Sequence, residues 1–310
     1  MYRDNSGKRY NSFSQYLKDS FGEKIYKVTL NANLGCPNRD GTKSFGGCIF
    51  CDDSGSFSKA HDANLDIKEQ LLTGISNLET RFKAKKFIAY LQSYSNTYAP
   101  VEILKNIYDA ALDNDKVVGL SIGTRPDCVD EEKIDLISSY TNKKEIWIEY
   151  GLQSIHDRTL LAINRSHTAQ EFIDAVRMTQ NKGIKIAAHV ILGLQGETKE
   201  DMLATAKALA DLGIDGVKLH ALCILKNSKL EQPYIAKELK VLEEDEYVDL
   251  VCSFMELLPA NVIIHRLAGN GYKKALLAPV WLGQKFKTLN KIDEWFENNN
   301  SWQGKKYSQK

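Results

Sequence analysis

The sequence predicts an α/β chain folded as a partial (β/α)6 barrel that stays open on one side. Six short apolar runs rich in β-branched and aromatic residues alternate with amphipathic stretches of helical period, which is typical of parallel strands joined by helices. Six units are too few to complete an eight-stranded barrel. Polar residues collect directly after five of the predicted strands, where β/α barrels carry their chemistry, so we expect one shared site there.

The elements follow one another without a break in the alternation. The predicted strands are residues 24–32, 86–92, 117–124, 145–154, 184–193 and 216–224. The predicted helices are residues 64–82, 101–113, 131–140, 168–183 and 198–213. Thr168 and Thr198 are placed to cap the starts of the last two helices, and Gly183 and Gly213 are placed to close their ends.

Length and composition favour one globular unit. The chain has 310 residues, of which 43% are hydrophobic and 26% charged, and its net charge of +1 excludes a global field that attracts polyanions. No proline-rich or Ser/Gly-rich linker interrupts residues 20–280. We therefore predict an N-terminal extension at residues 1–20, the barrel at 21–230, and a C-terminal helical and strand extension at 231–310. This extension closes the barrel and is not an independent domain.

The sequence shows no sign of export or membrane insertion. Its start has no apolar signal segment, and no stretch approaches the ~18 apolar residues of a membrane helix. We therefore expect a cytoplasmic protein with no membrane partner. In that reducing compartment, clustered cysteines indicate metal binding or catalysis rather than disulfides.

Cys36, Cys48 and Cys51 form a cluster of three thiols near the start of the chain. A structural zinc site and a saturated iron-sulfur cluster both want four ligands, so three cysteines on a 4Fe-4S cluster would leave one iron open to a cofactor or substrate. Phe50 lies between the last two cysteines, where it could shield the cluster from water. The alternative is a zinc knuckle in which Cys36 and His61 complete the ligand set.

With these motifs in order, the chain resembles radical S-adenosylmethionine (SAM) enzymes, specifically the elongator-catalytic-subunit-like branch that includes the coproporphyrinogen dehydrogenases. The closing CIFC at residues 48–51 matches the family, whereas the eleven residues between Cys36 and Cys48 exceed the commonest spacing and suit this branch. The other matching segments, in the same order as in the branch, are GTRPD at 123–127, YGLQS at 150–154, NRSHT at 164–168 and HVILGLQGET at 189–198. The resemblance covers roughly residues 20–230 and implies a barrel of the radical SAM type.

The resemblance implies two cofactors, a 4Fe-4S cluster held by Cys36, Cys48 and Cys51 and a SAM molecule chelated to its open iron. It further implies SAM contacts at residues that align with the family's motifs or replace them, namely Asn96, Thr124, Glu149, Gln153, Arg165, His189 and Leu222.

Each of these residues has an expected role. The loop that contains Asn96 is expected to meet the methionine ammonium, through backbone carbonyls or the Asn96 amide, and Gln153 to contact SAM. Arg165 is expected to pair with the methionine carboxylate, because a guanidinium fork suits a carboxylate. His189 and Leu222 are expected at the nucleoside and the adenine. Relatives often have a glutamate where this chain has Gly123, so the ribose is assigned instead to Thr124 or Glu149.

Segments near both ends of the chain resemble a smaller bacterial subgroup of single-domain proteins; these segments are residues 10–17, 21–28, 265–271, 277–286 and 302–306. For that subgroup the resemblance suggests a role on tRNA, in which carboxymethylaminomethyl-uridine at the wobble position becomes aminomethyl-uridine. The expected partners are tRNA and an external electron donor of the flavodoxin or ferredoxin type. A substrate that carries this acid favours a nearby cation, for which Arg125 and Arg266 are candidates.

Two other functions stay open on the sequence. One is a radical SAM enzyme that acts on a small molecule or a porphyrin, and the other is a zinc-bearing nucleic-acid-binding protein without catalysis. Residues 283–310 interleave lysines with aromatic side chains. This pattern is compatible with RNA binding, and an amphipathic helix that covers the open side of the barrel would show it equally.

Overall fold

The computed structural model describes residues 3–51, 65–269 and 275–308. Its centre is one curled sheet of seven strands, all pairing in parallel, in the order β1-β2-β3-β4-β5-β6-β8. The strands are β1 (Ile25–Leu30), β2 (Lys86–Leu91), β3 (Val117–Thr124), β4 (Glu145–Gln153), β5 (Lys185–Leu192), β6 (Gly216–Ala221) and β8 (Ile263–Arg266). The predicted partial barrel is therefore confirmed.

The sheet has one strand more than the six predicted. The seventh strand, β8, pairs with β6 and lies within the residues predicted as a C-terminal extension. It contains only four residues, too few for a recognisable apolar run, which explains why sequence periodicity did not indicate it. The C-terminal part of the chain therefore contributes a wall of the barrel.

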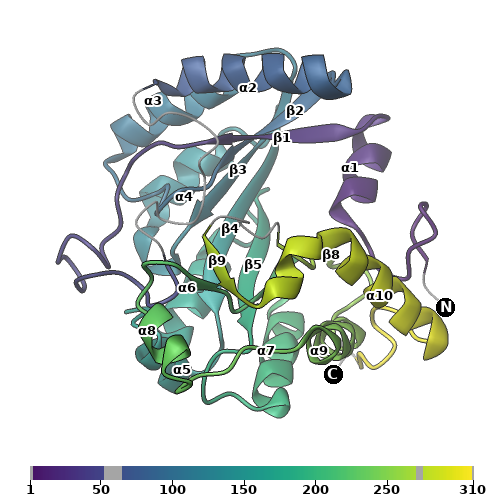
Figure 1. The fold of residues 1–310 in the computed structure, drawn as a ribbon. Helices are drawn as coiled ribbons and strands as arrows, with labels where there is room; N and C mark the ends of the chain where they lie inside the picture. Colours follow the sequence, from purple (N-terminus) through teal and green to yellow (C-terminus); the bar gives the residue numbers. More distant parts are fainter. Residues whose placement is uncertain (1–2, 52–64, 270–274, 309–310) are drawn as a thin grey trace.

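Helices cover the outer face of the sheet (Figure 1). The helices that join the strands are α2 (Ile67–Phe82), α3 (Val101–Leu112), α4 (Glu131–Ser138), α5 (Asp157–Ala162), α6 (Ala169–Thr179) and α7 (Lys199–Leu212), with a short 3-10 turn η1 (Pro126–Cys128). Apolar side chains fill the space between these helices and the sheet, among them Leu71, Tyr108, Phe172 and Leu209. This packing leaves the inner face of the sheet for the site.

The predicted helix caps are confirmed with one exception. Thr168 and Thr198 each form a capping box at the start of α6 and α7, and Gly213 closes α7 in the left-handed conformation. Gly183 does not close α6, because that helix ends at Thr179 and Gln180 already has extended backbone angles. The Gln180 side chain donates a hydrogen bond to the Leu212 carbonyl, which holds the chain away from the helical path. Gly183 instead turns the chain toward β5 with a φ of 75°.

An N-terminal helix, α1 (Phe13–Phe21), packs against β1 and β8 at the amino-terminal end of the barrel. Phe13 stacks on His265 with ring centroids 4.0 Å apart and meets Trp147 edge-on at 5.5 Å. Ile88, Ala187 and Ile263 belong to the same apolar cluster, which lies on the inner face of the sheet toward the amino-terminal ends of the strands. The barrel interior is therefore filled at its amino-terminal end.

The remaining elements follow β6. They are β7 (Ile224–Leu225), α8 (Glu231–Ile235), α9 (Glu244–Glu256), β9 (Leu276–Ala278), the 3-10 helix η2 (Val280–Gln284) and α10 (Lys285–Asn298). Helix α10 packs on α9 and buries Phe296 in the core, whereas Phe286 is exposed. The aromatic pattern of this segment thus reflects an amphipathic helix, one of the two interpretations of the sequence, although its partner is α9. Both termini lie near these two helices (Figure 1).

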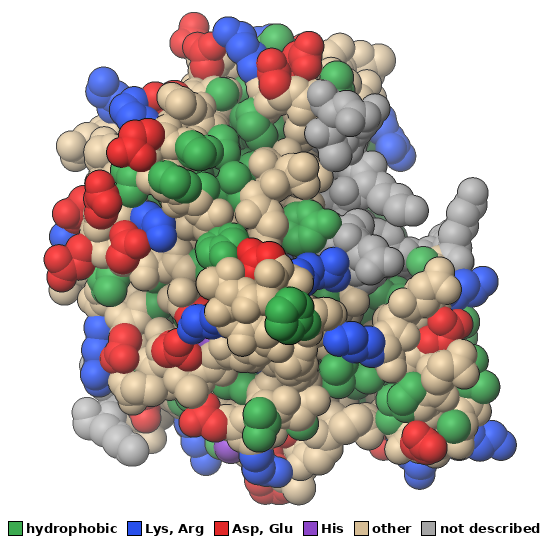
Figure 2. Space-filling view, turned by 90° about the vertical axis from the view of Figure 1, so that its left-hand side faces the viewer, with side chains coloured by type: hydrophobic (Ala, Val, Ile, Leu, Met, Phe, Trp, Pro, Cys, Tyr) green, Lys and Arg blue, Asp and Glu red, His purple; other side chains and the backbone are tan. Residues whose placement is uncertain are grey.

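No helix among the described residues is both long and apolar enough to cross a membrane. On the face shown in Figure 2, acidic and basic side chains are intermixed, in agreement with the net charge of +1.

Candidate functional site

A cavity of about 390 Å³ lies at the carboxyl ends of the strands. Residues from the ends of six strands and from the loops that follow them line it, including Gln92, Thr124, Gln153, Ile191, Leu222 and Arg266, together with Phe50 and Cys51 of the cysteine loop. The volume is in the range of small-molecule and cofactor sites. The predicted convergence of polar residues at this end of the barrel is therefore confirmed.

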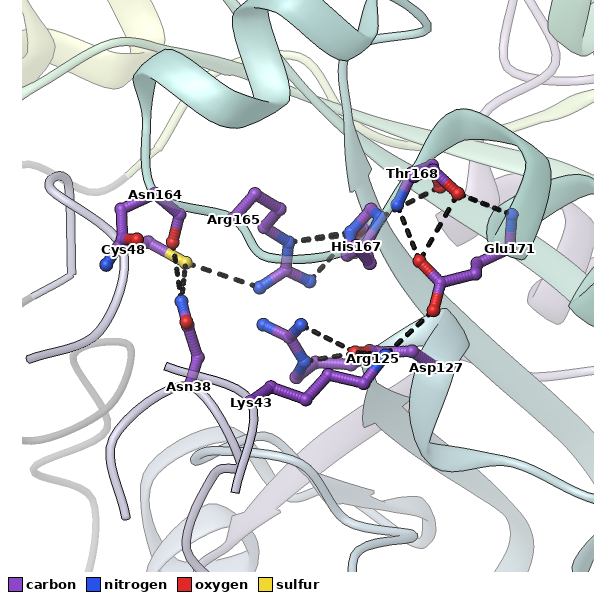
Figure 3. A network of polar contacts seen from close by, with 11 residues as sticks. Asn38, Lys43, Cys48, Arg125, Asp127, Asn164, Arg165, His167, Thr168 and Glu171 are labelled. Carbon is purple, nitrogen blue, oxygen red and sulfur yellow. Dashed lines mark hydrogen bonds and ion pairs between the residues drawn. The ribbon is translucent and has the colours of Figure 1, made fainter. Parts of the chain in front are cut away.

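The cysteine loop between β1 and α2 is anchored to the segments that follow β3 and β4. Lys43 forms ion pairs with Asp127 at 2.9 Å and with Glu171 at 2.7 Å. The Asn38 amide donates to the Asn164 carbonyl at 2.6 Å. These contacts hold the described part of the loop, residues 31–51, against those segments (Figure 3), and Phe50 and Cys51 reach the cavity.

The sulfur of Cys48 receives two hydrogen bonds from this surrounding. The Asn38 Nδ2 lies 3.3 Å from it, and the Arg165 Nη1 lies 3.5 Å from it (Figure 3). The hydrogen bond between the Cys48 and Cys51 thiols, helped by the charge of Arg165, holds the pKa of Cys48 well below its usual range. The same contact raises the pKa of Cys51. The site therefore favours a thiolate at Cys48, the form in which cysteine binds metal.

The described residues contain no ready-made group of three His, Cys, Asp or Glu side chains around a metal position. The donor set nevertheless fits an iron-sulfur cluster, because three cysteines lie on one loop and N–H groups point at a sulfur, as in such centres. Burial lowers the pKa of Arg125, but Asp127 and, more weakly, nearby Cys36 raise it above its ordinary value. His61, the fourth ligand of the zinc alternative, lies outside the described residues.

Arg165 lies between the cysteine loop and β4. It is buried, and its Nη2 and Nε donate to the Gly151 carbonyl at 2.7 and 3.2 Å. A side chain at position 151 would place Cβ 2.6 Å from Arg165 Nη2, so only glycine admits the guanidinium here. Its neighbours Asn164 and Ser166 both have positive φ, and this unusual backbone turns Arg165 toward the cavity.

Gln153 and Thr124 also line the cavity, as predicted. Gln153 follows a register shift at the end of β4 and has a φ of 78°, a strained conformation that re-aims its side chain. The Thr124 hydroxyl shares a hydrogen bond of 2.6 Å with that of Thr97. Leu222, directly after β6, is buried and lines the cavity from another part of the sheet.

The structure does not bring Asn96 to the cavity. Its amide donates to the Gly123 carbonyl at 2.8 Å, and its own carbonyl accepts from the Tyr108 hydroxyl at 2.7 Å. From the same loop, Gln92 and Tyr94 line the cavity in its place. The Asn96 Nδ2 thus holds the loop against β3, while its Oδ1 has no partner among the described residues, and contact of this loop with SAM stays a prediction.

Glu149 and His189 lie together on the inner wall of the cavity. Glu149 is fully buried and accepts from Lys27 at 3.0 Å, Lys218 at 2.8 Å, Ser121 at 2.5 Å and His189 Nε2 at 2.7 Å. Burial alone would raise the pKa of Glu149, but Lys218 and Lys27 outweigh it and hold this pKa well below its usual range. With both carboxylate oxygens engaged, Glu149 is bound within the fold, and the ribose assignment falls more naturally to Thr124.

Lys218 was not predicted as a site residue. It is buried on β6, lines the cavity, and donates to Glu149 and to the Tyr90 hydroxyl at 2.7 Å. Burial lowers its pKa to about 7, and Lys27 and Arg266 act in the same direction. The signal in the sequence was a lysine between apolar residues of a predicted strand, on the same face as His220 by alternation.

Arg125 forms a bidentate pair with Asp127, with both hydrogen bonds at 2.8 Å (Figure 3). Burial raises the pKa of Asp127, but Arg125 lowers it to about 2. One of the two cations considered for a substrate acid is thus already neutralised by the chain.

Comparison with known proteins agrees with this site. A family model described as the radical SAM superfamily matches residues 31–209, and a radical SAM C-terminal domain model matches residues 214–298. The chain is 38% identical to the uncharacterized protein YtqA of Bacillus subtilis, over 97% of this chain and 94% of that protein.

More distant relatives point to the elongator-like branch. A tRNA uridine(34) acetyltransferase of Methanocaldococcus infernus is 24% identical over 49% of this chain and 28% of its own length. The solved structure of the elongator protein Elp3 from the same archaeon superposes with a TM-score of 0.68 at 18% identity, covering 90% of this chain and 64% of that chain. At this identity the superposition demonstrates the common fold.

Proposed function

The chain belongs to the radical SAM superfamily, and we propose that its substrate is a modified wobble uridine of tRNA, which it converts from carboxymethylaminomethyl-uridine to aminomethyl-uridine. It is an enzyme whose cofactors are a 4Fe-4S cluster and SAM. The hypothesis of a zinc-bearing protein without catalysis is therefore wrong. A tRNA substrate also implies a cytoplasmic enzyme, with an electron donor of the flavodoxin or ferredoxin type.

The residues of this chain have separate tasks in the proposal. When bound, the cluster and SAM together supply a 5'-deoxyadenosyl radical that abstracts hydrogen. Cys36, Cys48 and Cys51 hold the cluster. Arg165, beside Cys48 and Gly151, binds the methionine carboxylate, and Gln153 contacts SAM from the end of β4.

The remaining cofactor contacts come from the cavity walls. Thr124 holds the ribose and Leu222 packs on the adenine, from opposite parts of the sheet. Phe50 lies in the cavity wall beside Cys51 and excludes water from the reacting atoms.

The observation that carries the substrate is the charge of the cavity. Its lining includes Arg125, Arg165, Lys218 and Arg266 but, among the described residues, a single acid, Glu149. An excess of cations favours an anionic substrate group such as the carboxylate of the carboxymethylamino side chain. The similarity to a protein named as a tRNA uridine(34) acetyltransferase supports the choice of a uridine at that position.

The hydrogen that we propose to be abstracted lies on the carbon between the amine nitrogen and the carboxylate. Nitrogen stabilises a radical on either neighbouring carbon, and the carboxylate adds stabilisation at the outer one, which is also the carbon that must leave with the acid. The buried walls of the barrel protect such a reactive centre from water and from other hydrogen donors.

Nucleoside analysis of total tRNA tests the proposal. Cells that lack this protein should accumulate carboxymethylaminomethyl-uridine and lose the derivatives made from aminomethyl-uridine. The wild-type gene should restore the profile, and Cys48→Ala should not. Cys252→Ala is the matched control, because this thiol is buried in α9, away from the cavity. An unchanged tRNA profile would reject the tRNA substrate and favour a small molecule or a porphyrin.

A further inference from the structure

The cations that line the cavity differ in what the chain provides for them. Arg125 pairs with Asp127, which also accepts from Lys43, and Lys218 shares Glu149 with Lys27. Arg165 donates to the Gly151 carbonyl and to the sulfur of Cys48. The side chain of Arg266, at the end of β8, has no hydrogen bond or ion pair with any part of the chain that the structure describes. The Nη1 of Arg125 also lacks a partner, but Asp127 holds that guanidinium through its other two nitrogens. Arg266 is therefore the lining cation whose side chain the described residues do not engage.

A second cation without a counter-ion lies near Arg266. Lys285 begins α10, is half-buried, and likewise has no hydrogen bond or ion pair within the described residues. Burial lowers the pKa of Lys285, and the charge of Arg266 lowers it further, which places the two cations within electrostatic reach. The sequence between them, residues 267–284, contains no Asp or Glu.

His220 adds a hydrogen-bonding group to this pair. It lies on β6, which neighbours β8, and its Nε2 is buried without a partner among the described residues. Burial lowers the pKa of His220 well below its usual value, and Arg266 contributes to the shift. A neutral imidazole keeps one N–H, which can be donated to an anion. A buried nitrogen without a partner and a guanidinium without a counter-ion line the same cavity. Together they form an anion-binding site that needs only its anion.

We propose that Arg266 and His220, which both line the cavity, bind the carboxylate of the substrate's carboxymethylamino group, with Lys285 adding positive charge from outside the lining; this inference rests on the proposed function. A guanidinium fork binds a carboxylate through two parallel hydrogen bonds, and a partly buried site strengthens them. The backbone phosphates of an RNA stay outside when a single nucleoside enters an enclosed cavity, so the anion that reaches Arg266 belongs to the base modification.

The subsite gives a reason for specificity. The product, aminomethyl-uridine, has lost the acid and carries an amine, which two unpaired cations repel. The same residues therefore favour substrate over product. Arg165 lies against the cysteine loop on the β4 side, so it stays available for the methionine carboxylate. The charge of Arg266 instead lowers the pKa of His220, Lys218 and Lys285, which lie on the other side of the cavity.

Binding to anticodon stem–loop RNA tests the subsite. The dissociation constants of two stem–loops, one with carboxymethylaminomethyl-uridine and one with aminomethyl-uridine, are measured with the cluster-loaded protein in the presence of SAM. The wild-type protein should prefer the acid-bearing RNA. Arg266→Gln should weaken binding of that RNA by about 10-fold to 100-fold and remove the preference, because a charge-assisted hydrogen-bond pair is lost. Lys285→Met should reduce the preference less.

Two controls accompany these variants. Lys287→Met removes an exposed lysine of the same helix, which pairs with Glu244, and should leave both dissociation constants unchanged. Retention of the iron-sulfur absorbance and of the thermal midpoint verifies that Arg266→Gln folds and binds its cluster.

Each other outcome overturns the subsite. Equal weakening for both RNAs would mean that Arg266 contacts a phosphate, and unchanged binding would mean that it contacts neither. A wild-type protein without preference for the acid would also reject it. If the enzyme converts tRNA while Arg266→Gln keeps the acid preference, the proposed function stands and only the subsite fails. An unaltered tRNA profile in cells without the protein would reject the function itself.

Discussion

The β4 side and the β8 side of the same cavity treat their charges in opposite ways. On the β4 side, Glu149 and Arg165 are buried and both are held by hydrogen bonds from the chain. On the β8 side, Arg266 and Lys285 have no such contact among the described residues. The difference teaches that the chain itself holds Glu149 and orients Arg165 toward its ligand, whereas the cations of the β8 side have no such support within the described residues. Changes on the β4 side should therefore affect stability, and changes on the β8 side should affect binding.

Acidification should give the largest effect. Burial lowers the pKa of His189 to about 4 and that of His265 to about 3, whereas an unfolded histidine takes up its proton near pH ~6.5. Between these values the unfolded chain binds more protons, so the free energy of unfolding should fall as pH decreases from ~6.5 to ~4, by about 1.4 kcal/mol per pH unit for each imidazole. Urea unfolding at several pH values measures this free energy. A constant value over the range would contradict a framework role for the buried His189 and His265.

Replacing Glu149 should come next. Glu149→Gln keeps the shape of the side chain but leaves Lys27 and Lys218 without their anion inside the barrel. Removing one partner from a buried ion pair costs about 3–5 kcal/mol of unfolding free energy. The control is Asp135→Asn, whose pair with Lys182 is exposed to solvent and should contribute little to stability. Similar losses of unfolding free energy for both variants would show that the buried contacts of Glu149 with Lys27 and Lys218 contribute no more than an exposed ion pair.

Gly151→Ala should have an intermediate effect. The added Cβ would lie 2.6 Å from Arg165 Nη2, so the guanidinium must leave its position between Gly151 and Cys48. Overpacking of this kind costs about 1–3 kcal/mol, and SAM binding should weaken in titration calorimetry. At Gly283 an added Cβ meets nothing within 4 Å, so Gly283→Ala should leave SAM binding unchanged. Wild-type SAM affinity in Gly151→Ala would exclude Arg165 as the carboxylate ligand.

Arg266→Gln should have the smallest effect on stability. It removes a cation that has no partner in the described structure and relieves its repulsion with Lys285. We expect the free energy of unfolding to stay within about 0.5 kcal/mol of the wild type. A loss as large as that of Glu149→Gln would mean that Arg266 belongs to the framework, and the contrast between the two sides of the cavity would disappear.

Most of the fold follows from local patterns in the sequence. All six predicted strands are present because each is a short apolar run between helical stretches, although β1, at the edge of the sheet, is only partly buried. Thr168 and Thr198 fix two helix starts. Strand β8 escaped prediction because four residues carry no period. Gly183 misled because a contact between Gln180 and Leu212, 32 residues apart, ends α6 earlier than the local pattern indicates.

Site residues could be predicted from the sequence where a motif contains them. They could not be predicted where the fold brings together residues that are far apart in the sequence. The cysteines, Arg165 and Gln153 follow from motif order. Lys218 did not, because its burial depends on Glu149, 69 residues away. The hydrogen bond from the Asn96 amide to Gly123 did not either, because a loop's sequence does not reveal which side chain it keeps for its own hydrogen bonds. Pairing over long sequence distance is what the structure adds.

Transfer of deuterium from substrate to SAM tests the central claim most directly. Stem–loop RNA carrying carboxymethylaminomethyl-uridine with deuterium on the carbon next to the carboxylate is incubated with the reduced, cluster-loaded enzyme and SAM. We predict that the 5'-deoxyadenosine formed contains deuterium and that aminomethyl-uridine appears in the RNA. Unlabelled 5'-deoxyadenosine, with the modified uridine unchanged, would contradict the account.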